Sequence, residues 1–258
     1  MKYLVLFKTI FINQWLYLKR YPINLLMSVI SMYLFFLVIF IGYKSMAAPG
    51  PGYGTTLDEI IVGFMLWLLT IMAVSELAWG LMDDAKTGIL EQLYLTPLGF
   101  TMVCIFRVIS AFLLNLLLII PIIFLMMVTT GRYLHLDMVS IIPLIILSIS
   151  SMLSIGFMMG GLTLIFKQLQ SVSSILEFAI LAFIAVPIEQ IPLFKILPLS
   201  LGSHLLRKVM VEKVFILDLP TTDLVILIIN SSCYLLAGFW VFSLSQQIAR
   251  KKGTFGHY

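Results

Sequence analysis

Charged residues are scarce in this sequence. Asp, Glu, Lys and Arg make up 11% of its 258 residues, whereas 61% are hydrophobic, and the mean hydropathy is +1.11. Soluble domains carry roughly a quarter charged and about half apolar residues. The composition therefore excludes an ordinary soluble domain and predicts a protein embedded in a lipid bilayer.

Cysteine and histidine are also rare. Only Cys104 and Cys233 occur, and neither lies in a candidate external loop, so no disulfide-linked ectodomain is predicted. The three histidines are scattered without the spacing of metal ligands: His135, His204 and His257. We expect no metal or other cofactor on this chain.

The sequence contains no Gly-x-x-x-x-Gly-Lys-Ser/Thr motif, the loop that cradles nucleotide phosphates. ATP binding by this chain is therefore not expected. The net charge of +4 comes largely from the two ends and does not indicate a nucleic-acid partner. The first residues are not expected to form a cleavable signal peptide, because the first long apolar run starts only after Pro22.

Six apolar segments approach the roughly 20 residues that a helix needs to cross a bilayer. They are Ile23–Tyr43, Ile60–Met82, Val108–Val128, Val139–Phe166, Ser171–Val186 and Leu224–Leu244. The predicted fold class is thus an all-α integral membrane protein with six transmembrane helices, in which residues 1–258 form a single transmembrane domain.

The distribution of Lys and Arg predicts the orientation, because these residues accumulate on the cytoplasmic side. With the N-terminus inside, ten of the sixteen lie inside and six outside. The inside set is Lys2, Lys8, Lys19, Arg20, Lys86, Arg107, Lys167, Arg250, Lys251 and Lys252; the outside set is Lys44, Arg132, Lys195, Arg207, Lys208 and Lys213. Both termini are therefore predicted to be cytoplasmic.

Residues 1–22 are predicted to form an amphipathic helix in the headgroup layer. At 100° per residue, one face carries Leu4, Phe7, Phe11, Trp15 and Leu18. The opposite face carries Lys2, Thr9, Asn13 and Arg20. Aromatic residues with basic flanks favour an interfacial position. Pro22 predicts a break before the first span and argues against the alternative, a simple extension of that span.

The segment Asp83–Phe100, DDAKTGILEQLYLTPLGF, joins the second and third spans and is predicted to be a cytoplasmic loop. Thr87 is expected to be the N-cap of a short helix, and Thr96 before Pro97 is expected to end it. The apolar face of this helix would consist of Ile89, Leu90, Leu93 and Tyr94, with Glu91 near its N-terminus. Such a helix either rests on lipid or presents its apolar side chains to a partner.

The pattern TGILEQLYLTPLG resembles the signature G-T-L-E-x-L-x-x-T-P in the first cytoplasmic loop of ATP-binding-cassette permeases of the type-two class, which includes exporters of drugs, antibiotics and polysaccharides. In that family the loop forms a coupling helix that docks into a cleft of the ATPase subunit. Thr87 and Gly88 match the signature only in reversed order. The closer matches are Ile89, Leu90, Glu91, Leu93, Thr96 and Pro97.

This resemblance implies a transport subunit, not an enzyme, in the cell membrane of a bacterium. Two permease subunits, identical or different, would form the translocation path, and ATP and Mg would bind a separate ATPase subunit. The cargo would be a lipophilic drug, antibiotic, peptide or lipid-linked glycan. The implied ATPase-coupling residues are Thr87, Gly88, Ile89, Leu90, Glu91, Leu93, Tyr94, Thr96 and Pro97.

Residues 187–222 are predicted to be an external region rich in proline, with Pro187, Pro192 and Pro198 closely spaced. The resemblance implies a short re-entrant pair of helices ending at Leu206–Arg207. Non-helical backbone at membrane depth is tolerated only where protein buries it or water surrounds it. The alternative is an ordinary interfacial loop.

Glu76 and Glu177 lie within apolar spans. Intramembrane carboxylates are costly and tend to face a bundle interior or a wet cavity, so both are candidates for a translocation path. They equally fit a packing role with polar partners. A different class of function, an ion-coupled secondary transporter, would use them as a proton relay. An intramembrane hydrolase would have to use the adjacent Ser203 and His204, which lack a Gly-rich nucleophile turn.

Overall fold

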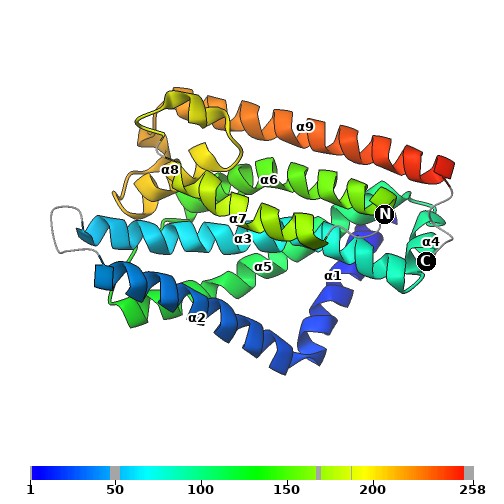
Figure 1. Ribbon diagram of the computed structural model, residues 1–258, viewed down its shortest axis with the longest axis horizontal. Coiled ribbons are helices and arrows are strands. Elements are labelled where there is room, and N and C mark those ends of the chain that lie inside the picture. The colour runs from blue at the N-terminus through cyan, green and yellow to red at the C-terminus, as the bar shows by residue number, and fades with distance from the viewer. Residues whose placement is uncertain (1, 47–52, 167–169, 187, 253–258) are drawn as a thin grey trace.

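The structure is a computed structural model that describes residues 2–46, 53–166, 170–186 and 188–252. The described residues form helices and their connections, without a strand, so the all-α prediction is confirmed (Figure 1). The helices are α1 (Lys2–Arg20), α2 (Pro22–Met46), α3 (Tyr53–Lys86), α4 (Ile89–Tyr94), α5 (Phe100–Thr130), α6 (Met138–Phe166), α7 (Gln170–Ala185), η1 (Pro192–Ile196), α8 (Ser200–Met210), η2 (Ile216–Asp218) and α9 (Thr221–Lys252).

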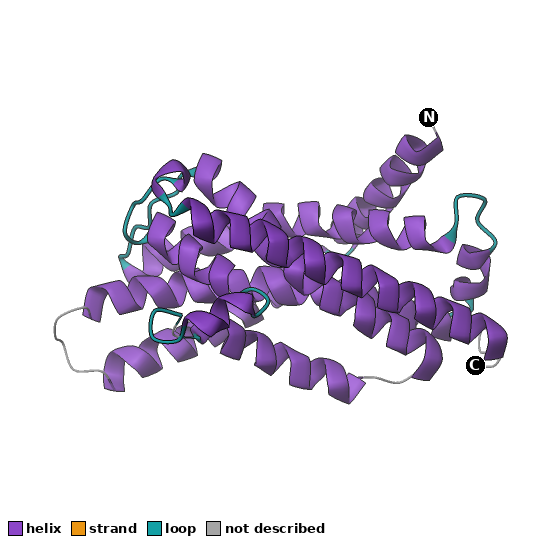
Figure 2. Ribbon diagram, turned by 90° about the horizontal axis from the view of Figure 1, so that it is seen from above, coloured by secondary structure: helices purple, strands orange, loops and turns teal. Residues whose placement is uncertain are grey.

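The long helices run side by side and give the molecule two distinct ends (Figures 1 and 2). One end carries α4, the N-terminal part of α1 and the last turns of α9. We call this the α4 end. The opposite end, which we call the α8 end, carries η1, α8 and the turn after α5.

Five described helices are long and apolar enough to cross a membrane, namely α2, α3, α5, α6 and α9. The multi-pass membrane character is therefore confirmed. The predicted fifth span is the shorter α7, whose 16 residues extend about 24 Å, less than the roughly 30 Å of bilayer hydrocarbon. Three other helices extend well beyond their predicted spans, because α3 starts at Tyr53, α5 starts at Phe100 and α9 ends at Lys252.

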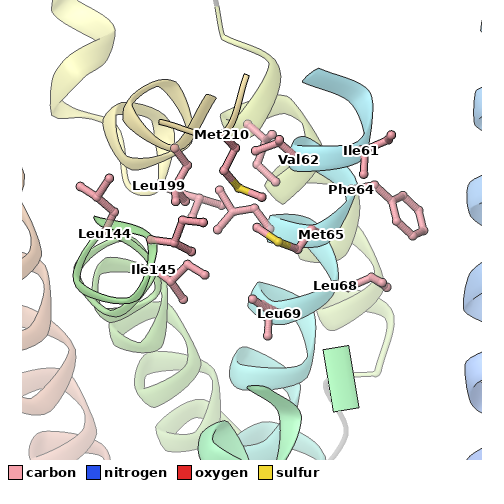
Figure 3. Packing of buried hydrophobic residues seen from close by; sticks show 14 of the residues in the cluster. Ile61, Val62, Phe64, Met65, Leu68, Leu69, Leu144, Ile145, Leu199 and Met210 are labelled. Atoms are coloured by element: carbon pink, nitrogen blue, oxygen red, sulfur yellow. The ribbon is translucent and has the colours of Figure 1, made fainter. Parts of the chain in front are cut away.

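Helix α3 is the centre of the bundle and contacts α5, α6, α7 and α8. Figure 3 shows Met65 of α3 and Ile145 of α6 in the space between the two helices, and Leu69 and Leu144 belong to the same buried cluster. Small residues let the backbones approach: a Cβ on Gly238 of α9 would lie 2.6 Å from the Cα of α6 Ser154. Close backbone contact through small residues is the usual way in which helices associate within lipid.

Residues 188–220 do not form a further long helix. They fold into η1, α8 and η2 before α9 begins at Thr221, and eight of the eleven residues of α8 are buried. Leu206 is fully buried, and Arg207 bonds the Ile184 carbonyl and Glu59. Pro187 lies outside the described residues.

Helix α1 ends at Arg20 and α2 starts at Pro22, so the predicted break is present. The ring of Phe7 lies 5.8 Å from that of Phe106 on α5, which places α1 against the bundle. On the face predicted to be apolar, Leu4 is 71% exposed and Trp15 45% exposed. Phe7, Phe11 and Leu18 of the predicted face are half-buried. The other half-buried residues of α1 are Leu6, Ile10 and Gln14.

Candidate functional site

Helix α4 is a six-residue helix that joins the long helices α3 and α5 at the α4 end (Figure 1). It is preceded by Gly88, whose φ of 72° and ψ of 6° lie in the left-handed region. Glycine adopts this conformation without steric cost, so it lets the chain leave α3 and turn directly into α4.

The prediction that Thr87 caps α4 is wrong. Its N–H donates to the Asp83 carbonyl at 3.0 Å, and its hydroxyl donates to the same carbonyl at 2.9 Å. Thr87 therefore completes the last turn of α3, and no side chain caps α4. Because Asp83–Lys86 are also helical, the connection between the helices is shorter than the predicted loop 83–100.

One side of α4 is held by the bundle. Leu90 is 2% exposed, and the Tyr94 ring stacks on Phe100 with centroids 4.0 Å apart. The Arg250 guanidinium of α9 lies 5.3 Å from the centre of the Tyr94 ring. Burial raises the pKa of Tyr94, so its phenol stays neutral at physiological pH. Ile89, Leu90, Leu93 and Tyr94 therefore do not form one exposed apolar face, contrary to the prediction, because Leu90 and Tyr94 pack against the bundle.

The exposed side of this connection carries different residues. Ile89 is 43% exposed and Leu95 84% exposed, and Glu91 and Pro97 are exposed beside them. Thr96 donates its hydroxyl to the Leu93 carbonyl at 2.7 Å and so closes the end of the helix. The surface open to a partner consists of Ile89, Glu91, Leu95 and Pro97, which we call the α4 tip.

Glu76 lies in a polar network that joins α1, α3 and α5. Arg107 Nε donates to Glu76 Oε1 at 3.3 Å, and its Nη1 forms an ion pair with Asp84. Gln14 Nε2 donates to the same Glu76 oxygen at 3.1 Å and to the Arg107 carbonyl at 3.3 Å. The glycine at position 80 leaves room, because a Cβ there would lie 2.8 Å from Arg107 Cζ.

The roles of Gln14, Asp84 and Arg107 are not apparent from residue type and position alone. The sequence predicts Arg107 only as a cytoplasmic charge and Asp84 only as part of a loop. The available signal was a single Arg among apolar residues of α5, which predicts a carboxylate partner because a buried charge is costly when unpaired.

A cleft of about 920 Å³ opens beside this network at the α4 end. Its walls come from α1, α3, α4 and α5, and its floor includes Glu76 and Arg107. Trp79 and Tyr17 add aromatic surface, and Leu114 adds apolar surface. The volume falls within the range of about 300–1,000 Å³ typical of small-molecule sites.

Glu177 is not part of this network. It lies on α7 beside Val74, Ser75 and Ala78, on a different side of α3 from the cleft that Glu76 lines. Its backbone carbonyl accepts a hydrogen bond from Trp67 Nε1 at 3.1 Å. Within the described part of the chain, no hydrogen bond or ion pair reaches its carboxylate, and the structure does not bring Glu76 and Glu177 together.

Ser203 and His204 do not form a nucleophile–base pair. The Ser203 hydroxyl donates to the Ser200 carbonyl at 2.8 Å and also lies 3.3 Å from the Ile184 carbonyl. Across the residues that the structure describes, no group of three His, Cys, Asp or Glu side chains is arranged to hold a metal ion.

The arrangement at the α4 end therefore combines a short anchored helix, an exposed tip and a charged network beside a cleft. No protein-family model matches this chain, and no curated protein matches it either.

Proposed function

We propose that this chain is the membrane subunit of an ATP-driven exporter that works as a dimer and couples to a separate ATPase subunit through α4. The observation that carries the proposal is the construction of α4. Leu90 and Tyr94 fasten it to the bundle, while Ile89 and Leu95 are left exposed. Apolar side chains on a short anchored helix suit a groove on a partner, where a few buried anchors supply most of the binding energy.

The packing of α4 would let it transmit a movement of the ATPase to the long helices. Tyr94 contacts Phe100 at the start of α5 and Arg250 near the end of α9, and Gly88 connects α4 directly to α3. A displacement of α4 by the ATPase would act on the inner ends of three long helices at once. Such a shift of packed helices is a common route to alternate conformations. ATP and Mg²⁺ would be bound and used on the ATPase chain.

In this proposal the protein lies in a bacterial cell membrane with six crossings, of which α7 is the short one, and with both termini cytoplasmic. Glu177 would face the path between two permease subunits. The cargo would be a lipophilic drug, antibiotic, peptide or lipid-linked glycan. The rival proton relay through Glu76 and Glu177 gains no support, because Arg107 and Gln14 engage Glu76 and the two carboxylates lie apart.

The central test is assembly with an ATPase of the exporter class encoded beside this chain. The full-length chain is co-expressed with it, and co-purification and ATP hydrolysis are measured. Ile89→Ala combined with Leu95→Ala should weaken assembly about thirtyfold, the effect expected of lost anchors. Leu217→Ala, a 91% exposed residue at the α8 end, is the matched control. Transport driven by a proton gradient without any ATPase would refute the proposal.

The topology has a separate test. Single cysteines replace Lys86, Tyr133 and Lys251 in a chain in which the exposed Cys233 is changed to Ser. A membrane-impermeant maleimide should label position 133 from outside, and positions 86 and 251 only after the membrane is opened. External labelling at position 86 would place α4 outside the cell and exclude its coupling to a cytoplasmic ATPase.

A further inference from the structure

The cleft at the α4 end is lined by both apolar and charged residues. Its apolar lining includes Ile10, Leu18, Val103, Ala111 and Leu114. Its charged lining includes Glu76, Asp84 and Arg107, which we call the floor of the cleft. A cleft with both kinds of lining fits an amphiphile, because hydrocarbon and headgroup each find matching surroundings.

The floor of the cleft has an uncompensated negative charge. Glu76 and Asp84 carry two carboxylates, and both pair with the single guanidinium of Arg107, which leaves one negative charge. At the mouth, Asp83 and Lys86 carry one charge of each sign and cancel. The linings from α1 and α4 contribute no charged residue. A cation is therefore attracted to this cleft more strongly than an anion.

Gln14, which lines the cleft, has an unused hydrogen-bond acceptor. The Gln14 amide donates to Glu76 and to the Arg107 carbonyl, while its Oε1 is buried and accepts no hydrogen bond. A buried acceptor without a donor costs free energy, so a small turn of the Gln14 side chain that brings Oε1 to a donor group of a ligand would be favourable. Trp79 and Tyr17 line the same cleft, and aromatic faces attract ammonium groups.

We propose that this cleft binds an amphiphile with a protonated primary amine as its headgroup. The ammonium group lies near Glu76, donates to Gln14 Oε1 and faces the Trp79 ring, and the hydrocarbon tail lies along α1 and α5. A primary ammonium fits better than a quaternary one, because only the former can donate a hydrogen bond to Gln14. The site does not depend on coupling to an ATPase, so it can hold if the proposed function fails.

Native mass spectrometry tests this on the full-length chain released from nanodiscs with equal parts of phosphatidylethanolamine, phosphatidylcholine and phosphatidylglycerol. We expect retention of phosphatidylethanolamine about tenfold above the other two. A second arm titrates dodecylamine into phosphatidylcholine nanodiscs and follows tryptophan fluorescence. Binding in the first arm identifies a membrane lipid as the source, and binding only in the second identifies a free lipophilic amine.

Two pairs of variants separate the site from general stability. Asn13→Lys adds a positive charge at an exposed cleft residue of α1, and Thr9→Lys adds the same charge one turn away, outside the cleft lining. Glu76→Gln neutralises the floor, and Glu177→Gln removes a carboxylate elsewhere. Asn13→Lys and Glu76→Gln should each reduce binding about tenfold, and their controls should not.

Equal retention of the three lipids together with no dodecylamine binding would overturn the proposal. Preferred retention of phosphatidylglycerol would overturn it as well, because it would show that the cleft selects an anion. If Asn13→Lys folds normally and binds the amine as the wild type does, the site lies elsewhere.

Discussion

The two ends of the bundle are built in opposite ways. At the α8 end, eight of the eleven residues of α8 are buried, and the Ser200 hydroxyl bonds the Phe183 carbonyl of α7 at 2.8 Å. At the α4 end, Leu90 is the buried residue of α4, and a cleft opens among α1, α3, α4 and α5. Dense packing resists local opening, whereas a few anchors allow it. We therefore expect α4 to open more readily than α8.

Ion pairs differ between the ends in the same way. At the α8 end, Lys195 pairs with Asp223 at 2.5 Å and fastens η1 to the first turn of α9. At the α4 end, the Arg107 guanidinium pairs with two carboxylates, and the Gln14 amide donates to one of them and to the Arg107 backbone carbonyl beside an open cleft. At the α8 end, the ion pair holds a short segment in place. At the α4 end, the charged side chains form a polar surface inside an apolar bundle.

The largest expected effect comes from filling the tightest contact at the α8 end. In Gly202→Ala, the new Cβ would lie 1.8 Å from Ser148 Oγ and 3.2 Å from Ser148 Cα of α6, so α8 must move. We expect a loss of about 3 kcal/mol in the free energy of unfolding, measured by denaturation in mixed micelles. Gly42→Ala, where nothing lies within 4 Å, should lose nothing. Similar stabilities for the two variants would show that the α8 end is not rigid.

A smaller loss is expected from the network at the α4 end. Arg107→Ala leaves Glu76 and Asp84 without their shared cation, and we expect about 2 kcal/mol of destabilisation, reduced from a fully buried case because the Arg107 side chain is 26% exposed. The control is Arg132→Ala, whose pair with Asp58 is longer at 3.7 Å, with an expected loss of about 0.5 kcal/mol. Equal losses in thermal unfolding would mean that the network is an ordinary surface pair.

The smallest stability effect concerns α4 itself. Tyr94→Ala removes the stack on Phe100 and should lower the free energy of unfolding by about 1 kcal/mol. Leu95→Ala, at a residue 84% exposed, should change it by less than about 0.5 kcal/mol. Hydrogen exchange in the segment 87–99 should rise for the first variant only. The opposite ranking would mean that Leu95 and not Tyr94 anchors the helix.

Much of the fold is predictable from the sequence because lipid demands long apolar helices. The break before Pro22 and the existence of a short helix at 89–94 are local features and could also be predicted. Helix ends could not. A hydropathy pattern stops where polar residues begin, yet the backbone hydrogen bonds of α3 continue through Asp84 and Lys86. Thr87 fits a cap by residue type, but its hydroxyl bonds backward into α3.

The place of the candidate site along the chain was predictable from the sequence, but its side-chain contacts were not. Which side of α4 faces the bundle depends on Phe100 and Arg250, and Arg250 lies far along the chain. The partners of Glu76 come from α1 and α5, and no periodicity within α3 identifies them. A single sequence shows that a carboxylate in an apolar span requires a partner, but only the packed helices show which one.

The space that Gly80 leaves for the Arg107 side chain restricts which substitutions this protein can accept. A methyl group at position 80 would lie 2.7 Å from Arg107 Nη2, so the guanidinium would have to shift and its bonds to Glu76 and Asp84 would become less favourable. Substitutions at positions 80 and 107 should therefore be correlated during evolution, although the two residues lie on different helices. Among descendants of this chain, we expect a side chain at position 80 more often where the residue at position 107 is shorter, and neutral residues at positions 76 and 84 more often in those same chains.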